Sequence, residues 1–348
     1  MKIFIKTYGC QANVNDSEII SGILAKNGYE LAENEEDADY IILNSCSVKN
    51  KTQSKIIDYI RKHKDKKIIA TGCLTKTIDI KKFGKNVYVK HFLNNKNKIN
   101  LPIVRNKKDT AIIQISQGCL NACTFCATKI AKGALKSYGI RDIKRAFEKA
   151  VAERCKIIYL TSQDNGCYGF DIGTNLPELL KELISVKGNY KIRIGMMNPW
   201  HLRKIKKELF EVIKNRRIIK FLHIPVQSGS EKVLENMKRM HSVKEFEKIA
   251  EEFRKKFPRK KFPDSTIATD IIVGYPTEKE EDFEQTLKLI KKVKPEVLNI
   301  SAFSSRPKTP ASKLKQLSSE VIKERTRRLN KLYWEYRKKI KIHNPKYS

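Results

Sequence analysis

The stretch 118–126 reads Gly118-Cys119-Leu120-Asn121-Ala122-Cys123-Thr124-Phe125-Cys126, with three residues between the first two cysteines and two between the last pair. This spacing holds three thiols in one short loop. Three thiolates can bind three irons of a [4Fe–4S] cluster and leave the fourth iron without a protein ligand. An open iron is a position for a substrate or cofactor, so the loop indicates catalysis more than scaffolding.

Three further cysteines, Cys10, Cys46 and Cys73, lie upstream at wide spacing. Around them the pattern alternates expected strands at 2–8, 39–44 and 67–70 with expected helices at 16–26 and 52–63. Buried, near-continuous apolar strands of this kind indicate a parallel sheet. Each cysteine follows the end of one strand, and parallel strands end at a common edge where ligands bind. We therefore expect the three thiols to meet in space.

A second series of strands and helices begins at Thr110. Expected strands at 111–115, 156–161, 191–196, 220–224, 266–273 and 297–301 alternate with expected helices at 140–153, 177–187, 202–213, 232–237 and 280–293. This repetition predicts a full or partial (β/α) barrel, whose chemistry lies at the carboxyl ends of its strands. The cysteine loop follows the first of these strands. Between the two series, residues 94–108 are polar and basic, and we interpret them as a linker or surface hairpin.

The predicted fold class is α/β, in three parts. An N-terminal parallel α/β domain covers 1–104, a partial (β/α)6 barrel covers 105–312, and a basic helical tail covers 313–348. The tail carries twelve lysines and arginines against three acidic residues. Its pattern predicts an amphipathic helix, whose basic face is either simply solvated or in contact with RNA.

The chain of 348 residues carries 72 Lys and Arg against 38 Asp and Glu, a formal charge of +34. Such an excess favours polyanionic partners, RNA or DNA above all, over the alternative of a lysine-rich solvated surface. No stretch approaches the length of a membrane span, and the N-terminus has no signal-peptide layout. We expect a soluble cytoplasmic protein without membrane association, whose cysteines are metal ligands or free thiols rather than disulfides.

The cysteine loop resembles the radical S-adenosylmethionine (SAM) signature, and six further motifs resemble the radical SAM methylthiotransferases in order along the chain. These are 7–13 (TYGCQAN), 44–48 (NSCSV), 71–73 (TGC), 222–230 (LHIPVQSGS), 270–276 (DIIVGYP) and 306–310 (RPKTP). The archaeal and eukaryotic branch of the family is most similar, on the stretches 118–129, 132–137, 161–164 and 171–177.

This resemblance implies an enzyme that inserts sulfur at carbon 2 of N(6)-threonylcarbamoyladenosine beside the anticodon of tRNA and methylates it, giving the 2-methylthio derivative. One [4Fe–4S] cluster at Cys119, Cys123 and Cys126 would bind SAM and cleave it reductively. A second [4Fe–4S] cluster on the three upstream cysteines would hold the sulfur, and a second SAM would supply the methyl group. An unactivated aromatic C–H bond lies beyond acid–base catalysis at ordinary pH, which independently favours a radical cofactor.

The implied partners are tRNA, an electron donor such as a ferredoxin or flavodoxin, and a sulfur source, and we expect a monomer. Six side chains are candidates for SAM binding, with a loop cap as the alternative for the first two and an ion pair for the third: Gln163, Asp164, Arg193, Gln227, Ser228 and Ser230. We interpret His223 as a core histidine, Cys155 as structural, and Cys167 as no ligand.

Family members normally end in a small RNA-binding β-barrel, and this chain stops at Ser348 before any such strand pattern. Either the chain is truncated, or its basic surface and tail take over tRNA binding. Three alternative functions are open: a methylthiotransferase for another tRNA base, one for a ribosomal protein, or a non-catalytic Fe–S protein that binds RNA. A zinc module fits six cysteines split three and three poorly.

Overall fold

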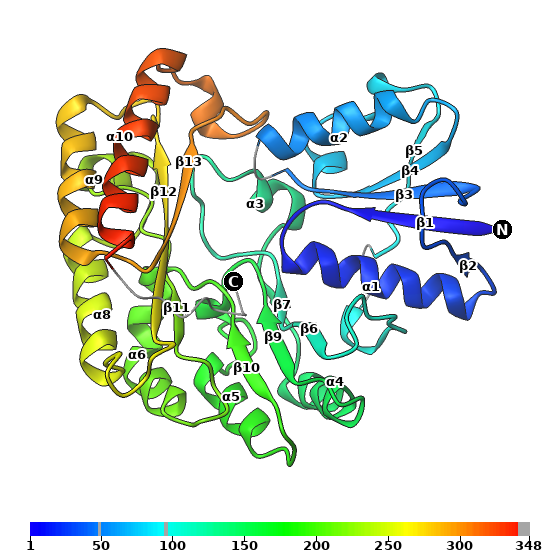
Figure 1. The fold of residues 1–348 in the computed structure, drawn as a ribbon, viewed down its shortest axis with the longest axis horizontal. Coiled ribbons are helices and arrows are strands. Elements are labelled where there is room, and N and C mark those ends of the chain that lie inside the picture. Colours follow the sequence, from blue (N-terminus) through cyan, green and yellow to red (C-terminus); the bar gives the residue numbers. More distant parts are fainter. Residues whose placement is uncertain (48–49, 94–96, 340–348) are drawn as a thin grey trace. The chain divides into compact units, whose positions relative to one another are not determined.

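The computed structural model describes residues 1–47, 50–93 and 97–339, drawn as a ribbon in Figure 1. Parts of three predicted features lie outside the described residues: Val48 of one motif, residues 94–96 of the expected linker and residues 340–348 of the tail. The chain divides into two compact units. The first comprises Met1–Cys119, Cys126–Gln163 and Gly188–Tyr190, and the second comprises Leu120–Phe125, Asp164–Lys187 and Lys191–Ser348.

The first unit contains a five-stranded sheet of order β2-β1-β3-β4-β5 in which every neighbouring pair is parallel. The strands are β1 (Lys2–Thr7), β2 (Glu30–Leu31), β3 (Tyr40–Ser45), β4 (Lys67–Gly72) and β5 (Val87–Val89), with helices α1 (Gln11–Lys26) and α2 (Asn50–Lys62). Ile41 and Leu43 pack in one apolar cluster with Ile56 of α2, whereas Ile42 packs in another with Ile20 of α1. The alternation along β3 therefore buries both faces of the sheet, as expected for a parallel sheet.

The rest of the first unit holds the start of the second series. Strand β6 (Thr110–Gln114) pairs in parallel with β9 (Ile157–Thr161), and the short strands β7 (Ser116–Gln117) and β8 (Lys136–Ser137) form an antiparallel pair. Helices α3 (Ala127–Lys132) and α4 (Ile140–Ala152) lie between β7 and β9 in the chain, and 3-10 turns cover Leu74–Lys76, Lys81–Phe83 and Lys98–Asn100.

The second unit continues the β/α series. It contains β10 (Lys191–Ile194) and a parallel sheet of order β11-β12-β13, formed by Phe221–His223, Thr266–Val273 and Val297–Ala302. Its helices are α5 (Leu176–Ile184), α6 (Pro199–Ile213), α7 (Glu231–Asn236), α8 (Val243–Lys256), α9 (Glu280–Val293) and α10 (Ser319–Arg337), with 3-10 turns at Asn165–Cys167 and Pro310–Lys313. The predicted α/β class with parallel sheets is confirmed, and the tail forms a helix as expected.

Three sequence expectations need correction. Helix α1 begins at Gln11 rather than at 16, because its first turns bury polar side chains such as Asn13 that show no apolar repeat. Helix α8 was not predicted, although Ser242 and Glu245 form a capping box at its start. The 94–108 segment is not a plain surface linker, since the side chain of Lys98 is only 4% exposed. No helix in the described part of the chain is both long and apolar enough to cross a membrane.

Candidate functional site

The three upstream cysteines lie at one edge of the five-stranded sheet. Cys10 follows β1, Cys46 follows β3 and Cys73 follows β4, and these three strands are neighbours. The Sγ atoms of Cys10 and Cys73 each lie 4.0 Å from Oδ1 of Asn13. A Cβ atom added at Gly9 would lie 2.9 Å from Cβ of Cys46. The strand ends thus place the three cysteines at one edge of the sheet, and the sulfurs of Cys10 and Cys73 lie beside the same amide oxygen.

Asn13 organises this edge, and sequence reasoning assigned it no role. Its amide nitrogen donates to the carbonyl oxygens of Tyr8 at 2.9 Å and Ser45 at 3.1 Å, which closely precede Cys10 and Cys46 in the chain. The side chain of Asn44 donates in turn to the Asn13 carbonyl oxygen at 2.8 Å. A single buried amide therefore fixes the backbone on which two of the thiols stand.

The thiols are suited to a metal rather than to a disulfide. All eight cysteines lie in the described residues, and none of them forms a disulfide. Burial raises the pKa of the Cys73 thiol to about 11, although Lys132 opposes the shift. A buried thiol of this kind becomes a thiolate when a metal binds it, and thiolates are the ligands that Fe–S clusters use. The donor set therefore fits a cluster at this edge.

The downstream cysteine loop is anchored in the first unit at its two ends. The backbone nitrogen of Cys119 donates to the carbonyl oxygen of Gly133 at 3.3 Å, and Lys129 Nζ donates to the carbonyl oxygen of Cys119. Cys126 is the N-cap residue of α3. Gly118 has φ of +70°, and a Cβ atom there would lie 1.8 Å from the carbonyl oxygen of Ala134. Only glycine fits at the entrance to the loop.

The middle of the loop is anchored in the second unit. Nη1 of Arg239 donates to Sγ of Cys123 at 3.6 Å, and its Nη2 donates to the carbonyl oxygen of Pro225 at 2.7 Å. The next residue, Thr124, lies with its hydroxyl 2.8 Å from that of Tyr275. Hydrogen bonds to cluster sulfurs are among the factors that set the reduction potential of a cluster. Arg239 is thus a functional candidate that the sequence alone did not identify.

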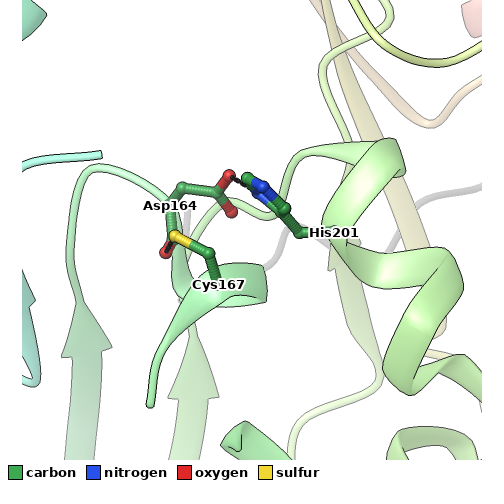
Figure 2. A group of neighbouring side chains, drawn as sticks. All are labelled: Asp164, Cys167 and His201. Carbon is green, nitrogen blue, oxygen red and sulfur yellow. Dashed lines mark hydrogen bonds and ion pairs between the residues drawn. The ribbon is translucent and has the colours of Figure 1, made fainter. Parts of the chain in front are cut away.

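Asp164 connects the loop to α6. Its carboxylate accepts hydrogen bonds from Nδ1 of His201 at 2.7 Å and from the side chain of Asn121 at 3.1 Å. Two backbone nitrogens, of Gly166 and Asn198, donate to its other oxygen. Figure 2 shows the carboxylate directed at the imidazole ring, with the thiol of Cys167 beside it. Protein donors thus engage both oxygens, which makes Asp164 a positioning residue for Asn121 within the loop.

Two of the six SAM candidates keep a buried polar atom available. Oε1 of Gln163, after β9, and Oε1 of Gln227, after β11, are buried and have no hydrogen-bond partner among the described residues. Gln227 also has φ of +79°, a conformation that costs free energy in a residue other than glycine. Buried polar groups are normally paired, so these amides fit residues that complete their hydrogen bonds with a bound cofactor.

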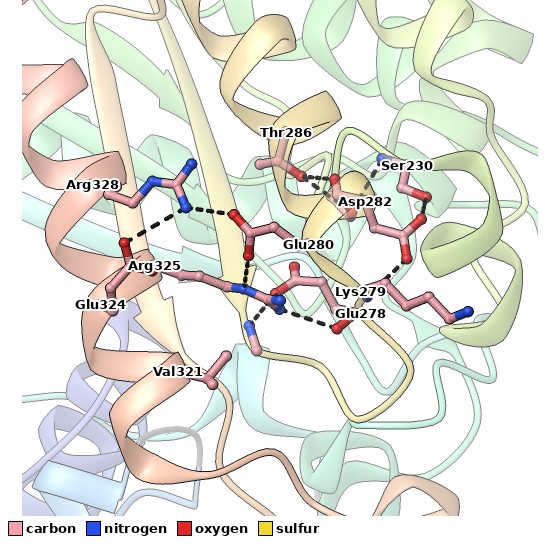
Figure 3. Close-up of polar contacts among 12 residues, drawn as sticks. Ser230, Glu278, Lys279, Glu280, Asp282, Thr286, Val321, Glu324, Arg325 and Arg328 are labelled. Carbon is pink, nitrogen blue, oxygen red and sulfur yellow. Dashed lines mark hydrogen bonds and ion pairs between the residues drawn. The ribbon is translucent and has the colours of Figure 1, made fainter.

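The three remaining candidates make protein contacts. Ser230 caps α7 and donates from its hydroxyl to Asp282 at 2.6 Å (Figure 3), and the Ser228 hydroxyl lies 3.4 Å from that of Thr286. The Arg193 guanidinium stacks on the ring of Phe221, with Cζ 3.4 Å from the ring centroid, and its Nη1 donates to the carbonyl oxygen of Ile194 at 2.7 Å.

The residues predicted to have no ligand role are part-buried or buried. His223, which we took for a core histidine, is part-buried, with Nε2 3.2 Å from the Asp270 carboxylate. The thiol of Cys167 donates to the carbonyl oxygen of Asp164 at 3.3 Å. That of Cys155 donates to the carbonyl oxygen of Lys108 at 3.7 Å.

Comparisons with known proteins cover both cysteine sets. Residues 2–94 match the family described as "Uncharacterized protein family UPF0004", and residues 113–290 match the Radical SAM superfamily. The chain is 39% identical over 360 residues to a protein of Pyrococcus horikoshii named probable threonylcarbamoyladenosine tRNA methylthiotransferase, across 95% of this chain and 84% of that relative. It is 38% identical over 372 residues to the threonylcarbamoyladenosine tRNA methylthiotransferase of Homo sapiens, across 96% of this chain and 63% of the human protein.

Among solved structures, the chain resembles the radical SAM methyltransferase TsrM from Kitasatospora setae, described with cobalamin and a [4Fe–4S] cluster bound. The TM-score is 0.61 at 10% identity, across 89% of this chain and 76% of that one. The radical SAM enzyme OxsB matches with a TM-score of 0.56 at 10% identity, across 96% of this chain and 56% of that one. At such identities the likeness shows a shared fold.

Proposed function

This chain belongs to the radical SAM threonylcarbamoyladenosine tRNA methylthiotransferase family, and we propose that it converts N(6)-threonylcarbamoyladenosine beside the anticodon of tRNA into its 2-methylthio derivative. The observation that carries the proposal is the presence of two sets of three cysteines in one chain. The upstream set stands at the carboxyl ends of three neighbouring parallel strands, and the downstream set forms one loop of eight residues. Two such sets match a reaction that needs both a radical source and a sulfur carrier.

The residues that would hold the cofactors follow from this arrangement. Cys119, Cys123 and Cys126 would ligate the cluster that binds SAM, and the upstream cysteines would ligate the second cluster. When bound, the clusters and SAM supply the one-electron chemistry, the sulfur and the methyl group that an unactivated C–H bond requires. The protein itself holds the loop in place. Arg239 donates to Cys123, and Asp164 orients Asn121 through a carboxylate that His201 supports.

For SAM binding we propose Gln163 and Gln227, whose buried amide oxygens have no partner in the described structure. Asp164, Ser228 and Ser230 would act indirectly by fixing the loops that carry these amides, since their side chains are engaged by protein groups. We also propose Arg193 as a partner of the SAM carboxylate, with its guanidinium held by the stacking contact on Phe221.

The proposed domain organisation keeps the boundaries expected from the sequence: residues 1–104 for the upstream cluster, 105–312 for the radical SAM core and 313–348 for the basic tail. We propose a cytoplasmic monomer that receives electrons from a ferredoxin or flavodoxin and sulfur from a separate donor. The charge of +34 supports a polyanionic substrate such as tRNA.

Helix α10 offers one surface for that tRNA. Three residues of its exposed face and the C-cap residue, spaced at helical repeats, combine three cations with an indole: Arg327, Lys331, Trp334 and the C-cap Lys338. Trp334 is 56% exposed. The opposite face is buried through Arg325, Leu329 and Tyr336. Cations bind the phosphate backbone and an exposed indole can stack on a base, so we propose that this face contacts tRNA.

The test is mass spectrometry of tRNA nucleosides from cells that lack the protein, with the purified enzyme assayed on their tRNA. We expect N(6)-threonylcarbamoyladenosine without its 2-methylthio group in those cells, and its conversion by the reconstituted enzyme in the presence of SAM and a reductant. An unchanged level of the 2-methylthio nucleoside in the deletion strain would contradict the proposed substrate.

A further inference from the structure

A basic cavity lies within the first unit, beside the upstream cysteines. It encloses about 230 Å³ and is lined by Cys73 together with residues from both cysteine regions. Gln117, two positions before Cys119, and Ala131 of α3, the helix that starts after Cys126, contribute to its wall. The cavity therefore opens among the segments that carry both sets of cluster ligands.

The wall of this cavity is strongly cationic. It contains four lysines against a single carboxylate, that of Asp16: Lys76, Lys98, Lys132 and Lys136. His91 also lines the wall, but burial and the charge of Lys76 lower its pKa, which favours the neutral imidazole. Asp16 is shared by two of the lysines, with Oδ1 at 2.6 Å from Nζ of Lys98 and Oδ2 at 3.0 Å from Nζ of Lys132. Burial alone would raise the pKa of the Asp16 carboxyl group, but the ammonium groups of Lys98 and Lys132 have the larger, opposite effect. The net pKa is therefore below its ordinary value, and the carboxylate stays ionised.

The carboxylate of Asp16 compensates only part of this cationic charge, and the sulfurs of Cys73 and Cys10 interact with Lys132 as well. Lys98 and Lys132 are held at the inner wall, with side chains only 4% and 11% exposed. Lys76 and Lys136 are exposed to solvent, and neither has a carboxylate within salt-bridge distance in the described part of the chain. Lys98 and Lys132 share Asp16, so the ammonium groups of Lys76 and Lys136 are the ones on this wall that are open to a small anionic ligand.

The proposed substrate carries such an anion. The threonylcarbamoyl group on N6 of the adenine ends in a carboxylate, and its threonine side chain carries a methyl group. Lysine ammonium groups bind carboxylates through charge-assisted hydrogen bonds. The remaining wall includes apolar side chains of Ile20 and Leu93, against which a methyl group can pack. An N6 substituent without charge would lack these charge-assisted hydrogen bonds and would bind less tightly.

We propose that this cavity binds the threonyl carboxylate of the modified adenosine, with Lys76 and Lys136 as its direct partners and the Asp16–Lys98–Lys132 cluster as their support. The inference rests on the proposed function and names the part of the substrate that this chain uses for recognition. The cavity adjoins both cysteine regions, so a substituent bound there would hold the adenine ring close to the chemistry.

The test compares two anticodon stem-loop RNAs that differ only at the threonyl carboxyl group. One carries N(6)-threonylcarbamoyladenosine and the other carries its methyl ester, and binding of each to the reconstituted enzyme is measured at constant salt. We expect the wild type to bind the free acid roughly tenfold more tightly than the ester, the scale of a hydrogen bond to a charged group. In Lys76→Gln and Lys136→Gln this preference should shrink several-fold, whereas Lys136→Arg should keep it.

The controls separate the competing roles of the lysines. Lys26→Gln, an exposed lysine at the end of α1, should leave the preference unchanged. If the glutamine variants weaken both RNAs equally, the lysines contact RNA phosphates, and the inference is overturned. If they lose iron, the lysines serve the upstream cluster instead, and it is overturned as well. The binding assay requires no turnover, so the two failures can be told apart. A wild-type enzyme that forms no 2-methylthio product refutes the proposed function, whereas the binding preference tests the role of the lysines.

Discussion

Asn13 couples the upstream thiols to the strands that carry them. Its amide nitrogen satisfies the carbonyl oxygens of Tyr8 and Ser45, and its amide oxygen lies 4.0 Å from the sulfurs of Cys10 and Cys73. Leaving a buried polar group unpaired costs about 1–3 kcal/mol. A neutral amide is suited to this position because it donates to two carbonyl groups without adding negative charge beside sulfurs that must become thiolates.

Asn13→Asp should therefore empty the upstream site. The carboxylate removes both donors at nearly constant volume and repels the thiolates at once. We expect about four irons per chain after anaerobic reconstitution, against about eight in the wild type, as measured by iron and sulfide analysis. Asn27→Asp, at the exposed end of the same helix, is the matched control and should retain about eight. A full iron complement in Asn13→Asp would show that the amide is dispensable.

Which site residues the sequence reveals depends on how local their signal is. Cys10, Cys46 and Cys73 could be placed because each follows a strand that its own apolar residues define. His201 and Arg239 could not, because their partners Asp164 and Cys123 lie 37 and 116 positions away in the chain. Such pairings are set by the packing of the elements, and no pattern within a single segment records them.

At the scale of elements, α10 is held to its unit by a buried ion pair. Nη1 of Arg325 donates to Glu278 at 2.9 Å, and its Nε donates to Glu280 at 3.1 Å (Figure 3). Burial raises the pKa of Glu278 to about 7, although the backbone N–H of Gly274 and the guanidinium of Arg325 oppose the shift. A carboxyl group whose pKa is raised on folding contributes stability at low pH that is lost as the pH rises through about 7.

Arg325→Leu should destabilise the protein in a pH-dependent way. At pH 8 it leaves Glu278 buried and charged without its partner, and we expect the free energy of unfolding to fall by about 3–5 kcal/mol. At pH 6 the loss should be smaller, because the carboxyl group can take up a proton. Urea unfolding at the two pH values measures the difference. Arg327→Leu, on the exposed face of the same helix, should change little, and an equal loss at both pH values would argue against this role of Glu278.

The lysines on the exposed face of α10 should contribute to tRNA binding. Lys331→Glu combined with Lys338→Glu should weaken tRNA binding and lower the slope of log affinity against log salt, by about 0.7–0.9 for each phosphate that is no longer neutralised. The matched control is Lys248→Glu with Lys255→Glu, which changes the same charge at the same seven-residue spacing on the exposed face of α8. Equal effects of the two pairs would mean that only the net charge matters.

Helix boundaries show why some elements were predicted better than others. The bounds of α9, Glu280–Val293, match the expectation, because three acidic residues mark its first turn and its apolar repeat is regular. The start of α1 was missed, because buried polar side chains replace the apolar repeat near the cysteines. The polar residues needed beside the cysteines replace the apolar repeat there, so the predicted start of α1 is wrong at the edge of the sheet that carries the thiols.

For the whole molecule, the sequence predicts an α/β fold with two series of parallel strands, because the apolar residues of each strand form a pattern within its own short segment. It does not predict the burial of Lys98. This residue lies in a polar stretch, yet its side chain is buried against Asp16, 82 positions upstream. A charged residue in a basic segment normally indicates solvent. Here its burial follows from the charge on a distant helix, which only the folded chain brings close.

The two cysteine sets should support separate parts of the reaction, namely cleavage of SAM and delivery of sulfur. Replacing Cys10, Cys46 and Cys73 by alanine should leave reductive cleavage of SAM intact and abolish the methylthio product, because the downstream loop has its own ligands and anchors. Replacing Cys119, Cys123 and Cys126 should abolish both. Each triple variant should retain about four irons per chain. Chromatography of 5′-deoxyadenosine and of the tRNA nucleosides measures the two outputs separately, and Cys155→Ala, which removes a thiol outside both sets, should keep both. A product formed without the upstream thiols would refute the sulfur-carrier role, and loss of SAM cleavage in that variant would show that the two sites do not work independently.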